Sequence, residues 1–139
     1  MIDFDNVSVS FSLPNGERHS VLEEVSFHIG RSEQAYLVGP TGSGKSTILR
    51  LLYMDLFPDS GVVHIEDYAS DRIEEDDIPY LRRSIGVVFQ DFQLLPDRNA
   101  YENVAFALYA TGKSRSEIQS RVTKALGRVG LSHKRRNYP

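Results

Sequence analysis

Residues 39–47 read Gly-Pro-Thr-Gly-Ser-Gly-Lys-Ser-Thr and fit the pattern G-x-x-x-x-G-K-S, which is typical of a phosphate-binding loop. Glycines let the backbone curl so that successive N–H groups point inward at phosphate oxygens. Lys45 brings a mobile cation to the outer phosphates, and the Ser46 hydroxyl is a predicted Mg²⁺ ligand. The predicted nucleotide-binding residues of this loop are Gly39, Pro40, Thr41, Gly42, Ser43, Gly44, Lys45, Ser46 and Thr47.

The segments that flank the loop support this interpretation. The apolar run 35–38 precedes it and is typical of a buried strand, while residues 46–54 follow it with a helical pattern of apolar side chains and predict a helix buried on a broad face. A helix that starts at the loop adds its positive N-terminal end to the phosphate site. Strand, loop and helix in this order distinguish the motif from a chance glycine-rich turn.

The rest of the N-terminal half predicts several strands. Residues 2–11 alternate apolar and polar side chains with one slip at Asp5-Asn6, and residues 21–29 form a second strand candidate. The sequence Pro14-Asn15-Gly16 between them predicts a turn, so the two strands are expected to form a hairpin. Residues 62–65 predict a further strand of this accessory sheet, and residues 85–89 a second buried strand.

The C-terminal part predicts helices. Residues 99–110 read as an alanine-rich helix. Ser114-Arg115-Ser116-Glu117 has the pattern of a capping box and predicts the start of another helix, which Gly130 ends. The residues expected on the buried face of that last helix are Ile118, Val122, Ala125, Leu126 and Val129.

Composition indicates an ordinary globular chain. It has 139 residues, 40% of them hydrophobic and 25% charged, with no cysteine, which excludes disulfides and thiolate metal sites. The net charge of −3 is uneven, because residues 113–139 hold eight Lys or Arg and one Glu. A basic end can indicate nucleic acid or anionic lipid, but a solvated helix face is the favoured interpretation.

The sequence does not support two classes of phosphate-loop protein, the GTPases and the small-molecule kinases. The D-x-x-G and N-K-x-D motifs of GTPases are absent after the loop. Small-molecule kinases place the loop close to the N-terminus, whereas here two predicted strands come first.

Together with the loop, residues 85–108 (IGVVFQDFQLLPDRNAYENVAFAL) resemble the nucleotide-binding domain of ABC ATPases. The resemblance implies that Gln90 coordinates Mg²⁺ and positions the attacking water, so Lys45 and Gln90 are the candidate catalytic residues and Ser46 and Gln90 the candidate metal ligands. It implies that Phe11 stacks on adenine and that the region after Gln90 receives a membrane subunit. The implied cofactors are ATP and Mg²⁺.

The resemblance also predicts the fold and its division. The fold class is α/β, a P-loop NTPase with an N-terminal antiparallel β-subdomain, an incomplete core sheet and the start of a helical subdomain. Residues 1–98 are expected to belong to the ATPase core and residues 99–139 to the helical subdomain.

Within the family, the chain resembles the FtsE type of cell-division ATPase, which acts with the membrane protein FtsX. The strings that carry this resemblance are Leu81-Arg82-Arg83, Phe89-Gln90-Asp91, residues 94–98 and residues 101–105. Lipoprotein-release and macrolide-export ATPases have similar strings and remain alternatives. The implied location is the cytoplasmic face of the membrane.

Several family motifs are absent: the L-S-G-G-Q signature, an apolar strand ending in Asp-Glu, and the later histidine. Residues 137–139 resemble the segment just upstream of the signature, so the chain is expected to be an N-terminal fragment that binds Mg·ATP without hydrolysing it. The intact protein is expected to form a homodimer, and the fragment to self-associate. A non-catalytic module docking on a membrane subunit is the alternative; a nucleic-acid partner is not expected, because the insertions of DNA-associated relatives are absent.

Overall fold

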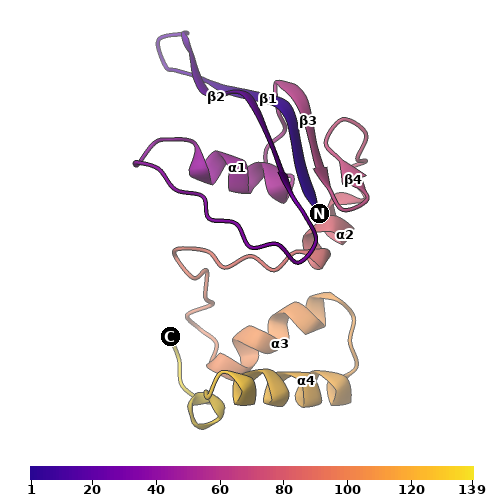
Figure 1. Cartoon of the computed structure of the whole chain (residues 1–139). Coiled ribbons are helices and arrows are strands. Elements are labelled where there is room, and N and C mark those ends of the chain that lie inside the picture. The colour runs from indigo at the N-terminus through magenta and orange to yellow at the C-terminus, as the bar shows by residue number, and fades with distance from the viewer. The chain divides into compact units, whose positions relative to one another are not determined.

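In the computed structural model, which describes residues 1–139, β1 (Ile2–Ser12) and β2 (Arg18–Ile29) form an antiparallel hairpin (Figure 1). Its turn is closed by hydrogen bonds between the backbones of Leu13 and Glu17 and from Gly16 N to Leu13 O. β3 (Ser60–Ile65) pairs with the other edge of β1, and β4 (Tyr68–Ala69) completes a sheet of order β2-β1-β3-β4. The predicted hairpin and accessory sheet are therefore confirmed.

The slip at Asp5-Asn6 in the sequence pattern is an irregularity of the strand. The register shifts between Phe4 and Val7, and Asn6 has a φ of 49°. An extra residue restores the alternation one position later, so both Phe4 and Val7 are buried. Gly61 on β3 lies against this bulge, because a Cβ there would be 2.3 Å from the Asn6 carbonyl oxygen.

One face of the sheet is covered by α1 (Lys45–Leu52) and α2 (Ile78–Ser84). Ile48 and Leu51 of α1 and Leu81 of α2 join the buried strand residues in one core. Each such side chain contributes about 1.5–3 kcal/mol when fully buried. Leu49 is 53% exposed, so α1 buries a narrower face than predicted.

An arginine fixes the end of α1. Arg82 of α2 donates from Nε to the Tyr53 carbonyl and from Nη2 to the Met54 carbonyl, both at 2.9 Å. These carbonyls follow the last turn of α1, where backbone acceptors lack helical partners. The helix that begins at the phosphate loop is thus held at its far end by charge-assisted hydrogen bonds.

The predicted buried strands at residues 35–38 and 85–89 are wrong for this structure. Both runs are irregular, and no strand pairs with either of them. Tyr36 and Val38 are 81% and 85% exposed, and Val88 is 93% exposed. Both runs are apolar as a buried strand requires, but a strand also needs neighbours for its N–H and C=O groups, and the sheet formed by this chain does not include them.

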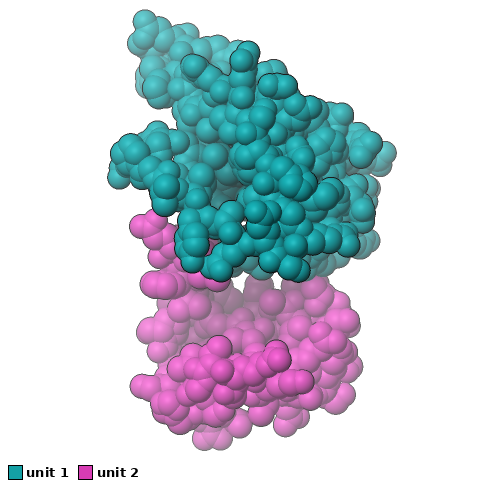
Figure 2. Space-filling model, viewed as in Figure 1, with its two compact units in different colours: residues 1–87 teal, residues 88–139 magenta.

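The chain divides into two compact units, residues 1–87 and 88–139, coloured separately in Figure 2. The division predicted after residue 98 concerns the functional parts of the family fold, and it stays a prediction. No helix in the structure has the length and apolar character required to cross a membrane.

The second unit consists of α3 (Ala100–Ala110), α4 (Arg115–Arg128) and the short helix η1 (Ser132–Lys134). Its core contains Ala105 of α3 with Ile118, Val122 and Leu126 of α4. Ala125 and Val129, which the sequence pattern placed in the core, are exposed. The reason is that a single neighbouring helix covers only a strip of α4 spaced by four residues, and that α4 has ended before Val129.

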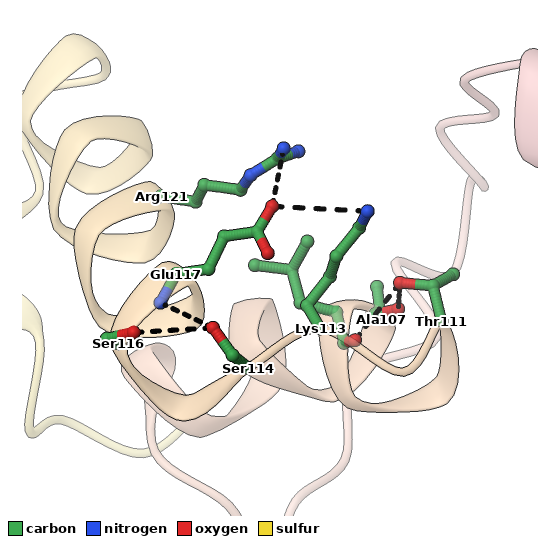
Figure 3. Close-up of polar contacts among 8 residues, drawn as sticks. Ala107, Thr111, Lys113, Ser114, Ser116, Glu117 and Arg121 are labelled. Atoms are coloured by element: carbon green, nitrogen blue, oxygen red, sulfur yellow. Dashed lines mark hydrogen bonds and ion pairs between the residues drawn. The ribbon is translucent and has the colours of Figure 1, made fainter.

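The capping prediction for α4 is half right. The Ser114 hydroxyl accepts a hydrogen bond from Glu117 N at 3.3 Å, but the Glu117 carboxylate turns instead to Arg121 at 2.7 Å and Lys113 at 3.9 Å (Figure 3). The reciprocal arrangement occurs on α3, where Asn99 and Glu102 each accept from the other's backbone N–H. The sequence signal for that box is Asn followed three residues later by Glu.

Candidate nucleotide site

The phosphate loop is an exposed turn that leads directly into α1. Gly42 and Gly44 have φ values of 85° and 83°, which side chains with a Cβ rarely adopt. Gly39 is needed for space, because a Cβ there would lie 2.6 Å from the Ser43 hydroxyl oxygen. Gly42 and Gly44 are therefore required by the backbone conformation, and Gly39 by the space that the Ser43 side chain occupies.

The last of these glycines anchors the loop to the hairpin. A Cβ at Gly44 would lie 2.8 Å from Leu22 Cδ2 and 3.2 Å from the Val21 carbonyl oxygen. α1 begins at the next residue, and no side chain caps it. Its first backbone N–H groups therefore remain available for an anion, as at other helix N-termini.

The Lys45 ammonium lies over the loop. Its Nζ donates to the carbonyl oxygens of Gly39 at 2.9 Å and Pro40 at 2.6 Å, with the Ser43 hydroxyl at 3.4 Å. A phosphate group in the loop would exchange these neutral acceptors for charged oxygens, which bind an ammonium more strongly.

The two hydroxyl residues after Lys45 face different surroundings. Ser46 is exposed, and its hydroxyl makes no hydrogen bond to the protein. Thr47 is 9% exposed and lies against the core. A hydroxyl oxygen beside phosphate oxygens suits Mg²⁺, which prefers oxygen ligands and retains several waters. Ser46 fits that role, whereas Thr47 supports the helix.

Phe11 lies at the end of β1, close to the hairpin turn. It is half-buried and packs against the core on the same face as Val7 and Val9. The loop meets the hairpin at Gly44, which lies against Leu22 and Val21 of β2, and Phe11 is on the partner strand of the same hairpin.

Gln90 belongs to the second unit, where it is exposed and follows a run without regular secondary structure. The loop after it presents Phe92 and Leu94, which are 73% and 52% exposed. Phe92 and Gln93 both have positive φ values, of 56° and 45°. This pair of left-handed, non-glycine residues marks a locally strained segment.

Asn103 holds the remainder of that loop, a role that sequence reasoning missed. Its Oδ1 accepts from Leu95 N at 2.8 Å, and its Nδ2 donates to the carbonyls of Leu95, Arg98 and Asn99 at 3.1, 2.8 and 3.1 Å. An asparagine near the start of a predicted helix, after a proline-containing loop, was the only signal in the sequence.

Two carboxyl groups of the first unit have a lowered pKa, and both lie outside the phosphate loop. Hydrogen bonds from the Ser10 hydroxyl and backbone N–H, with Arg18 nearby, lower the pKa of Asp59. Hydrogen bonds from the N-terminal ammonium and Arg31 lower the pKa of Glu66. Both are exposed partners that tie strands and loops together, and neither belongs to the candidate site.

Comparison with known proteins agrees with this geometry. Residues 22–139 match the family described as ABC transporter. The chain is 44% identical over 120 residues to the cell division ATP-binding protein FtsE of Streptococcus pneumoniae, covering 86% of this chain and 52% of the relative. FtsE of Bacillus subtilis is 42% identical over the whole chain and 59% of its own length. The methionine import ATP-binding protein MetN 2 of Pectobacterium atrosepticum is 40% identical over the whole chain and 41% of its length.

Solved structures of ATP-binding proteins have a similar backbone fold over the length of this chain. A dimeric post-hydrolysis state of the ATP-binding cassette MJ0796 with ADP and Pi has a TM-score of 0.88 at 30% identity, over all of this chain and 62% of that one. CbiO1 of Clostridium perfringens, part of an ABC transporter complex, has a TM-score of 0.81 at 28% identity, over 99% of this chain and 53% of that one. The chain thus spans about half to three fifths of the FtsE relatives and of these solved structures. By sequence match and by fold it belongs to the ABC transporter family, as part of an ATP-binding domain.

Proposed function

We propose that this chain binds Mg·ATP through the loop at residues 39–47. The observation that carries the proposal is the fixed start of α1, where Gly44 is anchored to the hairpin and Lys45 lies across the loop. In this arrangement the glycines and the first turn of α1 supply backbone donors, Lys45 supplies the cation for the outer phosphates, and Ser46 supplies the metal-ligating oxygen. Phe11 provides the ring for the adenine base.

The intact protein is proposed to hydrolyse ATP. Ser46 and Gln90 would hold Mg²⁺, which would supply positive charge against the charge that develops during phosphoryl transfer. Lys45 holds the transferred phosphate, and Gln90 is the proposed residue that orients water and completes the metal's ligands. The MJ0796 structure is dimeric and holds ADP and Pi, which supports a homodimer that turns over nucleotide.

This chain alone is proposed to bind nucleotide without turnover. Phosphoryl transfer depends on positioned charge and on a group that activates water. The 139 residues include no L-S-G-G-Q signature and no apolar strand ending in Asp-Glu. The donors described above can hold phosphates, but they leave the water without a general base.

Titration calorimetry tests this proposal. Wild type is expected to bind Mg·ATP, and Lys45→Ala is expected to lose that binding, because the loop then lacks its cation. Phosphate release that copurifies with the chain and disappears in Lys45→Ala would contradict the absence of turnover. Absence of ATP binding by a folded wild type would contradict the binding itself.

FtsE-type cell division is the proposed context, with an FtsX-type membrane subunit that docks on the region after Gln90. The 42–44% identity to two FtsE proteins supports it, as do the exposed Phe92 and Leu94 beside Gln90. The proposed location is the cytoplasmic face of the membrane, through that subunit. Capture of FtsX by wild type, and its loss in Phe92→Asp, would support this docking surface; equal capture by both would contradict it.

A transport ATPase is the second candidate, favoured by the 40% identity to MetN 2 over the whole chain. Lipoprotein-release and macrolide-export ATPases belong to the same candidate class. Pull-down with FtsX and with the membrane subunits of these transporters in parallel separates them. Docking that is equal for wild type and Lys45→Ala, with and without ATP, would instead indicate a non-catalytic interaction module.

A further inference from the structure

We propose that His19 is a second base-contacting residue of the nucleotide site and that it recognises a purine ring together with Phe11. This inference rests on the proposed binding of ATP. It extends the site from β1 to β2 and gives a specific role to a side chain that the phosphate-loop motif does not include. Phe11 and His19 are direct partners across the hairpin.

The last of three register irregularities along the hairpin produces this pairing. Val9 pairs with Leu22, but Ser10 pairs with Ser20, so Val21 is an extra residue on β2. In a regular register continued from Val9, His19 would pair with Ser12 on the opposite face. A bulge shifts the alternation of the residues beyond it and can re-aim a side chain toward a site.

Contacts on both faces of the sheet support this assignment. On the outer face, Asp59 accepts from the Ser10 hydroxyl at 2.7 Å and pairs with Arg18 at 2.9 Å. Ser10 and Arg18 therefore share that face. Phe11 and His19, which alternate with them along their strands, share the other face, which packs against α1.

The bulge itself faces the phosphate loop. A Cβ on Gly44 would lie 3.3 Å from Val21 Cγ1 and 2.8 Å from Leu22 Cδ2, so two consecutive side chains of β2 point toward the start of α1. His19 lies two residues from Val21, or about 7 Å along a strand. A nucleotide with its phosphates in the loop can reach the end of the hairpin over this short span.

The His19 ring is available for a ligand. The side chain is exposed, and no hydrogen bond or ion pair engages it. The core covers part of the Phe11 side chain, so only part of its ring surface is free to stack on a base. A purine has two fused rings, and two neighbouring aromatic side chains present a wider stacking surface than one. Stacking of a base on an aromatic side chain is worth about 1–3 kcal/mol.

Calorimetry with two ligands, Mg·ATP and Mg·tripolyphosphate, tests the inference with the full chain. Tripolyphosphate occupies the loop but has no base. His19→Ala and His19→Gln are expected to weaken ATP binding about fivefold or more and to leave tripolyphosphate binding unchanged. His19→Phe is expected to retain ATP binding because it keeps a ring. Ser20→Ala, on the outer face, is the matched control and is expected to change neither affinity.

The outcomes separate this inference from the proposed function. The role of His19 is overturned if a folded His19→Gln or His19→Ala binds ATP as the wild type does. It is also overturned if these variants bind ATP and tripolyphosphate more weakly by the same factor. In both cases the proposed binding of nucleotide stands. Equal affinity of the wild type for ATP and tripolyphosphate also overturns the role of His19, since no base is then recognised. Binding of neither ligand by the wild type overturns the proposed function, and the role of His19 with it.

Discussion

The last glycine of the phosphate loop, Gly44, lies directly against Leu22 of the hairpin, since a Cβ on Gly44 would be only 2.8 Å from Leu22 Cδ2. Gly44→Ala is therefore expected to combine backbone strain at φ 83° with overpacking. Strain and overpacking together are expected to lower the free energy of unfolding by about 2–5 kcal/mol. Urea denaturation measures it.

Gly42→Ala is the matched control for this prediction. Gly42 has nearly the same φ, 85°, but a Cβ there would meet nothing within 4 Å. Only the strain of about 1–2 kcal/mol is expected. Equal losses for the two variants would show that contact with Leu22 does not constrain the loop.

Asn103 is expected to be important for the segment between Leu95 and Asn99. Asn103→Ala removes an acceptor from Leu95 N and donors from three carbonyls, at a predicted cost of about 1–3 kcal/mol. Hydrogen exchange at the Leu95 amide should accelerate, because its only acceptor is lost. Gln119→Ala, an exposed change on α4, is the control; unchanged Leu95 protection in Asn103→Ala would contradict the prediction.

The sequence predicted those parts of the site that depend on residues close together in the chain. The loop at residues 39–47, the hairpin and both long helices depend on short-range patterns, so periodicity and turn residues indicated them. Gly44 was predicted as a phosphate-binding glycine, but its packing on Leu22 depends on two segments that lie far apart in the chain.

The failures have the same origin. Residues 35–38 and 85–89 have the composition of strands, yet pairing partners cannot be read from composition, and this structure provides none. Ala125 and Val129 fit a helical stripe, but the width of the buried face depends on what packs there. The position of His19 depends on a bulge at Val21 that no alternation pattern in the sequence revealed.

Acid titration should reveal the contacts of Asp59. Its pKa is lowered from 3.8, chiefly by hydrogen bonds from Ser10 and further by Arg18. Because the folded pKa is the lower one, the contribution to stability is present above the unfolded pKa and is lost as pH falls through the folded pKa. Ser10→Ala is expected to raise the Asp59 pKa toward 3.8, as followed by carboxyl carbon NMR. Ser12→Ala, which removes a neighbouring hydroxyl without a bond to Asp59, should leave that pKa unchanged.

Val122 of α4 and Val129, the residue that follows this helix, should respond differently to replacement by alanine. Val122 is 0% exposed and Val129 is 67% exposed. Val122→Ala deletes buried methyl groups and is expected to lower the free energy of unfolding by about 1–3 kcal/mol, allowing for the better helix propensity of alanine. Val129→Ala should stay within about 0.5 kcal/mol. Similar losses of unfolding free energy for the two variants, measured by thermal or urea unfolding, would contradict this prediction and favour the broader buried face that the sequence pattern predicted.

Val38 is expected to promote self-association of this chain. It is 85% exposed, and Tyr36 two residues before it is also exposed, in an irregular run that no strand pairs. Unpaired backbone with exposed apolar side chains offers a surface for association with another chain. Wild type is expected to show a weight-average sedimentation coefficient that rises with concentration, and Val38→Lys is expected to reduce that rise. Gln119→Lys adds the same charge on α4 and should not reduce it. A wild type that sediments as a monomer at all concentrations would contradict this prediction, and it would indicate that the exposed run is not sufficient to recruit a second copy.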